Sequence, residues 1–132
     1  MKKMSPVVHF ELPAKDRSRM AGFYSGVFGW LTTQHGEDMG NYITVSTTET
    51  DENGRPKRPG AINGGFYPER PGMQNYPSIV IAVDDIGQSI KDINKAGGKV
   101  LGEPVAIPGV GSYASFTDTE GNTIGILQPQ MG

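Results

Sequence analysis

Polar and apolar residues follow the same order in two stretches of the chain. Residues 9–31 align on residues 78–100 without a gap, at a constant shift of 69 positions (78 minus 9). In each stretch a short apolar run leads to an aspartate, then to an amphipathic segment, and then to a glycine. These are the signals of a strand, a helix N-cap, a helix and a helix stop. The pattern therefore predicts a duplicated strand–helix unit.

The first copy begins with a strand predicted over 7–12 and a helix from Asp16 to Gly29. The apolar residues of this helix recur at helical spacing and predict one buried face: Met20, Phe23, Tyr24, Val27 and Phe28. We expect Phe23 and Phe28 in the core. Further strands are predicted over 30–34, 41–47 and 60–67, and the alternation within 41–47 is typical of a sheet with two different faces. The polar residues 51–59 predict an exposed hairpin loop that turns at Asn53-Gly54.

The second copy follows a proline-rich linker over 68–77. A strand over 79–83 precedes Asp85, which is predicted to cap a helix, with Gln88 completing a capping box. Ile86, Ile90, Ile93 and Gly97 form one narrow stripe on this helix. Strands over 99–103, 111–117 and 123–128, with a turn at 118–122, complete the copy.

Each half thus reads βαβββ, which predicts an α+β fold. We expect one domain over 1–132, with a first module at 7–67 and a second at 78–129. Two such modules are expected to form a curved mixed sheet, with the helices covering one face and the other face lining a cavity between the modules. A homodimer is also expected, because half-modules expose strand edges and concave faces that a partner can cover.

Composition narrows the classes of function. The 132 residues carry a net charge of −2 and no dominant basic cluster, so we expect no nucleic acid as partner. The chain has no cysteine, which excludes disulfides, thiol nucleophiles and thiolate metal sites. The basic N-terminus is followed by a run that His9 and Glu11 interrupt, so neither a signal peptide nor a membrane span is predicted. A cytoplasmic protein is the resulting expectation.

Three stretches carry a family resemblance: His-Phe-Glu-Leu at 9–12 with Asp16 and the Phe23-Tyr24…Phe28-Gly29-Trp30 run, Val83-Asp84-Asp85 with Ala96-Gly97-Gly98, and Phe116-Thr117-Asp118…Gly121-Asn122. Together they resemble the vicinal oxygen chelate superfamily, which includes glyoxalase I, bleomycin and fosfomycin resistance proteins, extradiol dioxygenases and methylmalonyl-CoA epimerase. The resemblance is greatest to a glyoxalase-related branch of unknown function.

The resemblance implies four metal-ligand positions, one on each of four strands. In this sequence they fall on His9, Gly64, Ser78 and Gly125, with Asn63 replacing Gly64 if the register slips by one. Glycine offers no donor and neutral serine is a poor ligand, so we expect no functional metal and no cofactor. Glyoxalase I and dioxygenase activities are not expected, since in this family they depend on that metal.

The remaining candidates for chemistry are His9 and Glu11, which alternate along one strand and share a face. They could act as a general acid and base. We favour a hydrogen-bonded histidine retained from ancestry, because one histidine without a nucleophile is thin support for catalysis. The predicted ligand contacts are His9, Glu11, Tyr42, Asn63, Ser78, Tyr113 and Ser115.

The sequence leaves three functions open. The first is a metal-free protein that binds a small organic molecule. The second is a metal-independent isomerase or lyase, so whether the protein is an enzyme stays open. The third is an interaction domain with a vestigial cavity.

Overall fold

The computed structural model describes residues 3–72 and 75–130. They fold into two compact units. The N-terminal unit runs from His9 to Pro77, and the C-terminal unit combines the segment that ends at Val8 with the segment that begins at Ser78. The first two residues of the opening strand therefore group with the second half of the chain, where the Ala82 amide donates a hydrogen bond to the Pro6 carbonyl oxygen (2.9 Å). The prediction of a single domain stays a prediction.

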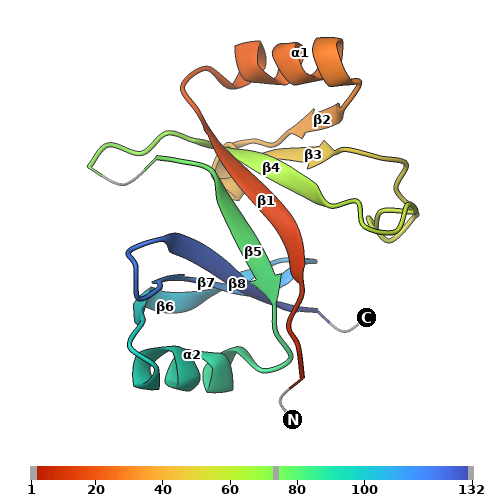
Figure 1. Ribbon diagram of the computed structural model, residues 1–132. Helices are drawn as coiled ribbons and strands as arrows, with labels where there is room; N and C mark the ends of the chain where they lie inside the picture. The colour runs from red at the N-terminus through yellow and green to blue at the C-terminus, as the bar shows by residue number, and fades with distance from the viewer. Residues whose placement is uncertain (1–2, 73–74, 131–132) are drawn as a thin grey trace. The chain divides into compact units, whose positions relative to one another are not determined.

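The N-terminal unit has the predicted βαβββ order (Figure 1). Its elements are β1 (Val7–Ala14), α1 (Arg17–Phe28), β2 (Leu31–Gln34), the 3₁₀-helix η1 (Glu37–Met39), β3 (Ile43–Ser46) and β4 (Asn63–Pro68). The strands are ordered β2-β3-β4-β1, with β1 parallel to β4 and the other pairs antiparallel. The Asp16 side chain accepts a hydrogen bond from the Arg19 amide at 3.0 Å, and Gly29 ends α1 with φ 73°. Both predicted helix boundaries are confirmed.

The core of this unit lies between α1 and one face of the sheet. Its buried residues are Ala14, Ala21, Ile43, Val45 and Phe66, and Phe10, Leu12, Met20, Tyr24 and Trp30 pack against them. Ile43 and Val45 are 0% and 2% exposed, whereas Thr44 between them is exposed. The predicted alternation along β3 is therefore confirmed, and it directs every second residue of the sheet away from the helix.

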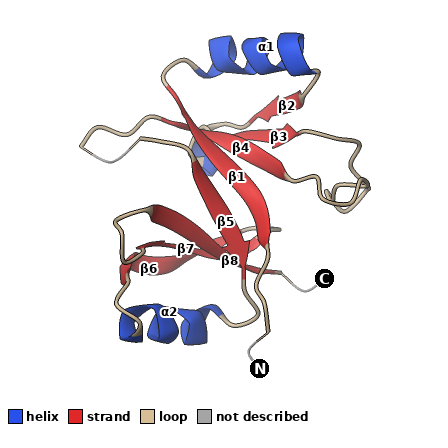
Figure 2. Cartoon of the chain, viewed as in Figure 1, coloured by secondary structure: helices blue, strands red, loops and turns tan. Residues whose placement is uncertain are grey.

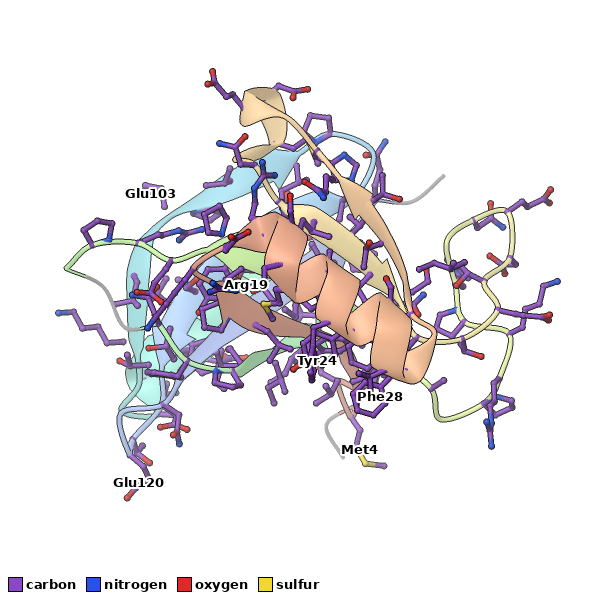
Figure 3. The ribbon with its side chains drawn as sticks, turned by 90° about the horizontal axis from the view of Figure 1, so that it is seen from above. Met4, Arg19, Tyr24, Phe28, Glu103 and Glu120 are labelled. Atoms are coloured by element: carbon purple, nitrogen blue, oxygen red, sulfur yellow. The ribbon has the colours of Figure 1, made fainter. Side chains whose placement is uncertain are left out.

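Part of the predicted helix stripe is wrong. Phe23 and Phe28 are 56% and 59% exposed rather than in the core, and Val27 of the same predicted face is 59% exposed. Phe23 precedes the half-buried Tyr24 by one position, so it points about 100° away around the helix. Phe28 lies in the last turn and rests on the rings of Tyr24 and Trp30, with centroids 5.9 Å away in both cases. Figure 3 shows Tyr24 and Phe28 on the same side of α1.

A long connection joins β3 to β4 and is drawn as loop in Figure 2. Within it Asp51 accepts hydrogen bonds from the amides of Asn53 and Arg55 at 2.9 and 3.0 Å, and Gly54 has φ 80°. The predicted turn at Asn53-Gly54 is confirmed. These amide contacts lower the pKa of the Asp51 carboxyl.

The C-terminal unit repeats the arrangement. Its elements are β5 (Ser78–Ala82), α2 (Ile86–Lys95), β6 (Lys99–Ile107), β7 (Gly111–Thr117) and β8 (Thr123–Pro129), and its strands are ordered β5-β8-β7-β6. The pair β5/β8 is parallel and the others are antiparallel, as in the first unit. Figure 1 shows α2 along one face of this sheet, where Ile86, Ala114 and Ile126 are buried.

Asp85 caps α2 as predicted, by accepting a hydrogen bond from the Gln88 amide at 3.1 Å. The predicted capping box is wrong in its second half, because the Gln88 side chain donates to Asp92 at 3.0 Å. No helix among the described residues is long and apolar enough to cross a membrane. The fold is α+β, built from two βαβββ modules.

Candidate functional site

The face of the N-terminal sheet that points away from α1 gathers polar side chains. Glu11 of β1 lies beside Gly65 of β4, and Gly65 lies beside Thr44 of β3. Residues paired across a sheet share a face, and residues two apart along a strand do so as well. This side, called the polar face below, therefore carries His9, Glu11, Tyr42, Thr44, Asn63, Gly65 and Tyr67.

A chain of hydrogen bonds joins three of the predicted site residues on this face. The Tyr42 hydroxyl donates to Glu11 Oε2 at 3.0 Å, and the same hydroxyl oxygen lies 3.0 Å from His9 Nε2. All three side chains are partly buried. One phenol thus bridges an imidazole and a carboxylate that extend from the same strand.

Gly65 makes room for this bridge. A Cβ atom at position 65 would lie 2.0 Å from the Tyr42 hydroxyl oxygen and 2.1 Å from the ring carbon that bears it. Both distances are far inside van der Waals contact. The Tyr42 ring therefore lies directly on the backbone of Gly65, and no other residue type fits beneath it.

The segment before β3 sets the position of Tyr42. Asn41 takes a left-handed conformation with φ 56°, and its carbonyl oxygen accepts a hydrogen bond from Arg17 Nη1 at 2.8 Å. The same guanidinium nitrogen donates to the His35 carbonyl at 3.2 Å, and the His35 amide donates to the Tyr42 carbonyl at 2.9 Å. The start of α1 thus fixes the backbone from which the Tyr42 side chain extends.

Burial controls the protonation of the site. Burial lowers the pKa of His9 below its ordinary value of 6.5, and the Glu11 carboxylate partly opposes the shift. Neutral imidazole is therefore the dominant form near pH 7. Burial also raises the pKa of Tyr67, whose hydroxyl donates to the Tyr76 carbonyl at 3.0 Å, and the charge of Glu11 adds to the rise. The guanidinium of Arg70 lies 5.5 Å from the centre of the Tyr67 ring.

The other predicted contacts fall into two groups. Asn63 shares the polar face, but its amide holds the loop after β3, with Oδ1 accepting from the Thr47 amide and Nδ2 donating to Thr50 Oγ1. Ser78, Tyr113 and Ser115 belong to the C-terminal unit. Ser78 Oγ donates to the Thr123 carbonyl at 2.7 Å and ties β5 to β8. The cavity between the modules, and these residues as ligand contacts, stay predictions.

The strand register corrects one of the inherited metal positions. Val80, the repeat of Glu11, pairs with Gly125, whereas Glu11 itself pairs with Gly65. The counterpart of Gly125 is therefore Gly65 and not Gly64. A Cβ at Gly64 would lie 2.5 Å from the Phe10 ring, on the face that packs against α1. Asn63, the alternative, lies beside His9 and is two residue pairs away from Gly65 along the β1/β4 ladder.

The residues present do not fit the metal that the family resemblance implies. No group of three or more His, Cys, Asp or Glu side chains that could hold a metal ion occurs within residues 3–72 and 75–130. Two of the four inherited positions are glycines and a third is Ser78, whose hydroxyl donates to a carbonyl. On the polar face, the Tyr42 hydroxyl lies between His9 and Glu11.

The C-terminal unit repeats the contact between a tyrosine ring and a glycine, but it lacks the histidine and the glutamate. A Cβ at Gly125 would lie 2.6 Å from the Tyr113 hydroxyl oxygen, which matches the arrangement at Gly65. The positions equivalent to His9 and Glu11 are Ser78 and Val80. The imidazole–phenol–carboxylate chain is therefore confined to the N-terminal half of the duplication.

The C-terminal unit also has an open groove of about 380 Å³, lined by residues 106–108, 111–112 and 128–130. None of the predicted ligand contacts lines it. Sequence reasoning missed Gly65 and Tyr67 on the polar face. The signal for Tyr67 is its place next to the apolar Phe66 in the strand, because neighbouring residues of a strand point to opposite faces.

Comparisons with known proteins agree with this fold. The family model of the Glyoxalase/Bleomycin resistance protein/Dioxygenase superfamily matches residues 7–126. A glyoxylase-like domain-containing protein of Didymella fabae is 32% identical over 121 residues, which are 86% of this chain and 85% of that protein. CFP32 of Mycobacterium tuberculosis is 35% identical over 68 residues, or 52% of this chain. The anthracycline biosynthesis protein DnrV of Streptomyces peucetius is 30% identical over 125 residues, or 85% of this chain. The matches cover only 26% of CFP32 and 42% of DnrV.

Solved structures share the fold at low identity. Methylmalonyl-CoA epimerase from Mycobacterium tuberculosis superimposes with a TM-score of 0.70 at 13% identity, over 99% of this chain and 94% of that one. Protein BH1468 of Bacillus halodurans gives a TM-score of 0.71 at 14% identity, over 98% of both chains. Because the family model spans most of the sequence, this chain belongs to the Glyoxalase/Bleomycin resistance protein/Dioxygenase superfamily.

Proposed function

We propose that this protein binds a small organic molecule on the polar face, through His9, Tyr42 and Glu11, without a resident metal or other cofactor. The observation that carries the proposal is the hydrogen-bonded chain of these three side chains. Partly buried polar groups that converge on one face are typical of a ligand site. Each such group needs a hydrogen-bond partner, and a bound ligand can supply that partner or add a further hydrogen bond.

The relatives agree with a role in small-molecule chemistry. DnrV carries anthracycline biosynthesis in its name, and the family includes bleomycin resistance proteins. By analogy with that family, we also propose a cytoplasmic protein that acts as a homodimer. Light scattering coupled to size exclusion gives the mass in solution, and a monomer of 14.2 kDa would contradict the dimer.

A thermal-shift screen of small organic compounds tests the binding proposal. Compounds that bind the polar face raise the melting temperature, and Glu11→Gln weakens that response because the carboxylate becomes an amide. The matched control is Glu52→Gln, in the exposed loop of the same unit. A screen in which no compound stabilises the protein, or in which both variants respond alike, would refute the proposed site. Elemental analysis of the native protein tests the metal-free part, and a stoichiometric transition metal would contradict it.

A second candidate is an isomerase or lyase that uses His9 and Glu11 in acid–base steps. The neutral imidazole and the adjacent carboxylate favour it, since a base with a pKa below neutrality is unprotonated and ready to accept a proton. The methylmalonyl-CoA epimerases share only the fold, yet they supply a probe. Incubation with methylmalonyl-CoA in D₂O reports deuterium incorporation at C2. Exchange that His9→Gln and Glu11→Gln both abolish would support this candidate, and the absence of exchange would refute it for this substrate.

A further inference from the structure

The hydrogen-bond chain on the polar face has a direction. A carboxylate only accepts hydrogen bonds, and a phenol carries one proton. The Tyr42 proton points to Glu11 Oε2 at 3.0 Å, so the Tyr42 oxygen must accept in its contact with His9. The hydrogen in that second contact therefore belongs to Nε2 of His9.

This direction decides the tautomer of the imidazole. A neutral histidine carries its proton on one ring nitrogen, and the other nitrogen is an acceptor. Burial keeps His9 neutral near pH 7. With the proton on Nε2, the lone pair lies on Nδ1, and none of the described residues donates a hydrogen bond to that atom.

We infer that the Tyr42–Glu11 pair holds His9 as the Nε2–H tautomer, so that Nδ1 is the atom through which the site accepts a hydroxyl or N–H donor from its ligand. This inference rests on the proposed function and deepens it. It assigns the ligand class as a hydrogen-bond donor, and it makes Tyr42 a positioning residue that selects such ligands by fixing the imidazole proton.

The tautomer is measurable in the ligand-free protein. A ¹⁵N spectrum that correlates ring nitrogens with ring protons distinguishes a protonated from an unprotonated nitrogen. The chain has two histidines, and His35 is an internal reference in the same spectrum, with its Nε2 3.1 Å from Thr44 Oγ1. We expect His9 to show a protonated Nε2 and an unprotonated Nδ1 near pH 7.

Two variants separate this positioning role from a structural one. Tyr42→Phe keeps the ring over Gly65 but removes the hydroxyl, so the His9 signals should shift towards a mixture of tautomers. The matched control is Tyr24→Phe, which removes a hydroxyl from α1, on the opposite face of the same sheet, and should leave His9 unchanged. A wild-type protein with the proton on Nδ1, or an unchanged tautomer in Tyr42→Phe, would overturn the inference.

Phenol and anisole test the ligand class, because anisole carries a methyl group in place of the hydroxyl hydrogen and cannot donate a hydrogen bond. Phenol should move the Nδ1 signal of His9, with an affinity about two- to tenfold above that of anisole, the usual margin of one hydrogen bond. Equal responses to both probes, or no response to either, would overturn the assignment of a donor ligand. The proposed function would still stand if the compound screen found a stabilising ligand, so the two failures are distinguishable.

Discussion

Replacing Gly65 with alanine should displace the Tyr42 ring and break the bridge between His9 and Glu11. The new Cβ would lie 2.0 Å from the Tyr42 oxygen, whereas ordinary contact begins near 3.4 Å, so the hydroxyl must retreat by about 1.4 Å (3.4 minus 2.0). A shift of that size takes both 3.0 Å hydrogen bonds out of range.

The loss of stability follows from the two hydrogen bonds that break and from the smaller conformational freedom of alanine in the unfolded chain. A hydrogen bond to a charged group contributes about 1.5–3 kcal/mol and one between neutral groups about 0.5–1.5 kcal/mol. The site is half-buried, so water can replace part of the lost hydrogen bonding. Alanine also restricts the unfolded chain more than glycine does, which favours folding by about 0.4–1 kcal/mol. We expect a net loss of about 1–3 kcal/mol in the free energy of unfolding, which lowers the melting temperature by about 3–5 °C per kcal/mol.

Urea denaturation of a double-mutant cycle gives the decisive measurement. Gly65→Ala should destabilise the wild-type protein but be neutral or stabilising in a Tyr42→Ala background, where the ring is absent. Gly22→Ala is a control on the exposed surface of α1, where a Cβ meets nothing within 4 Å and helix propensity favours alanine by about 1 kcal/mol. The reasoning is refuted if Gly65→Ala costs the same with and without Tyr42.

Four further predictions follow from other parts of the structure. Because the pKa of His9 is lowered on folding, the unfolded chain binds more protons just below pH 6.5. The free energy of unfolding should therefore fall as the pH drops through that window. Urea titrations of His9→Gln should show a smaller fall, and an identical pH dependence in the variant and the wild-type protein would contradict the prediction. Phe66→Ala should cost about 3–5 kcal/mol because Phe66 is 0% exposed, whereas Phe23→Ser, at 56% exposure, should cost less than about 1.5 kcal/mol by the same assay. Asp16→Ala should lower stability by about 1 kcal/mol through the lost helix cap, and Asp16→Ser should restore most of it. Treatment with EDTA should leave the melting temperature unchanged, and a clear drop would reveal a resident metal.

Local signals predicted much of the fold. Asp16 and Asp85 start their helices as expected because a capping carboxylate acts on amides within one turn. The alternation along β3 predicted the burial of Ile43 and Val45, since the side-chain period of a strand is independent of its neighbours. Because the two halves repeat each other, a strand or helix predicted in one half also predicted its counterpart in the other.

Predictions that depended on packing between elements were wrong more often. The helical spacing of Phe23 and Phe28 is compatible with a buried stripe, but α1 contacts the sheet through Met20, Ala21 and Tyr24. The sequence could not choose between Gly64 and Gly65 because a shift of one residue in β4 reverses which face each occupies. His9 and Glu11 were expected to share a face, whereas their connection through Tyr42 depends on pairing across three strands.

The contact between Tyr42 and Gly65 couples two positions that lie 23 residues apart (65 minus 42). A larger residue fits at position 65 only after a smaller side chain has replaced the tyrosine at position 42 or the ring has moved. The substitution at position 42 must therefore come before the one at position 65. Homologues that regain a side chain at the glycine should have lost the phenol first. The residues at these two positions therefore separate homologues that keep the phenol between His9 and Glu11 from homologues that present other polar side chains there.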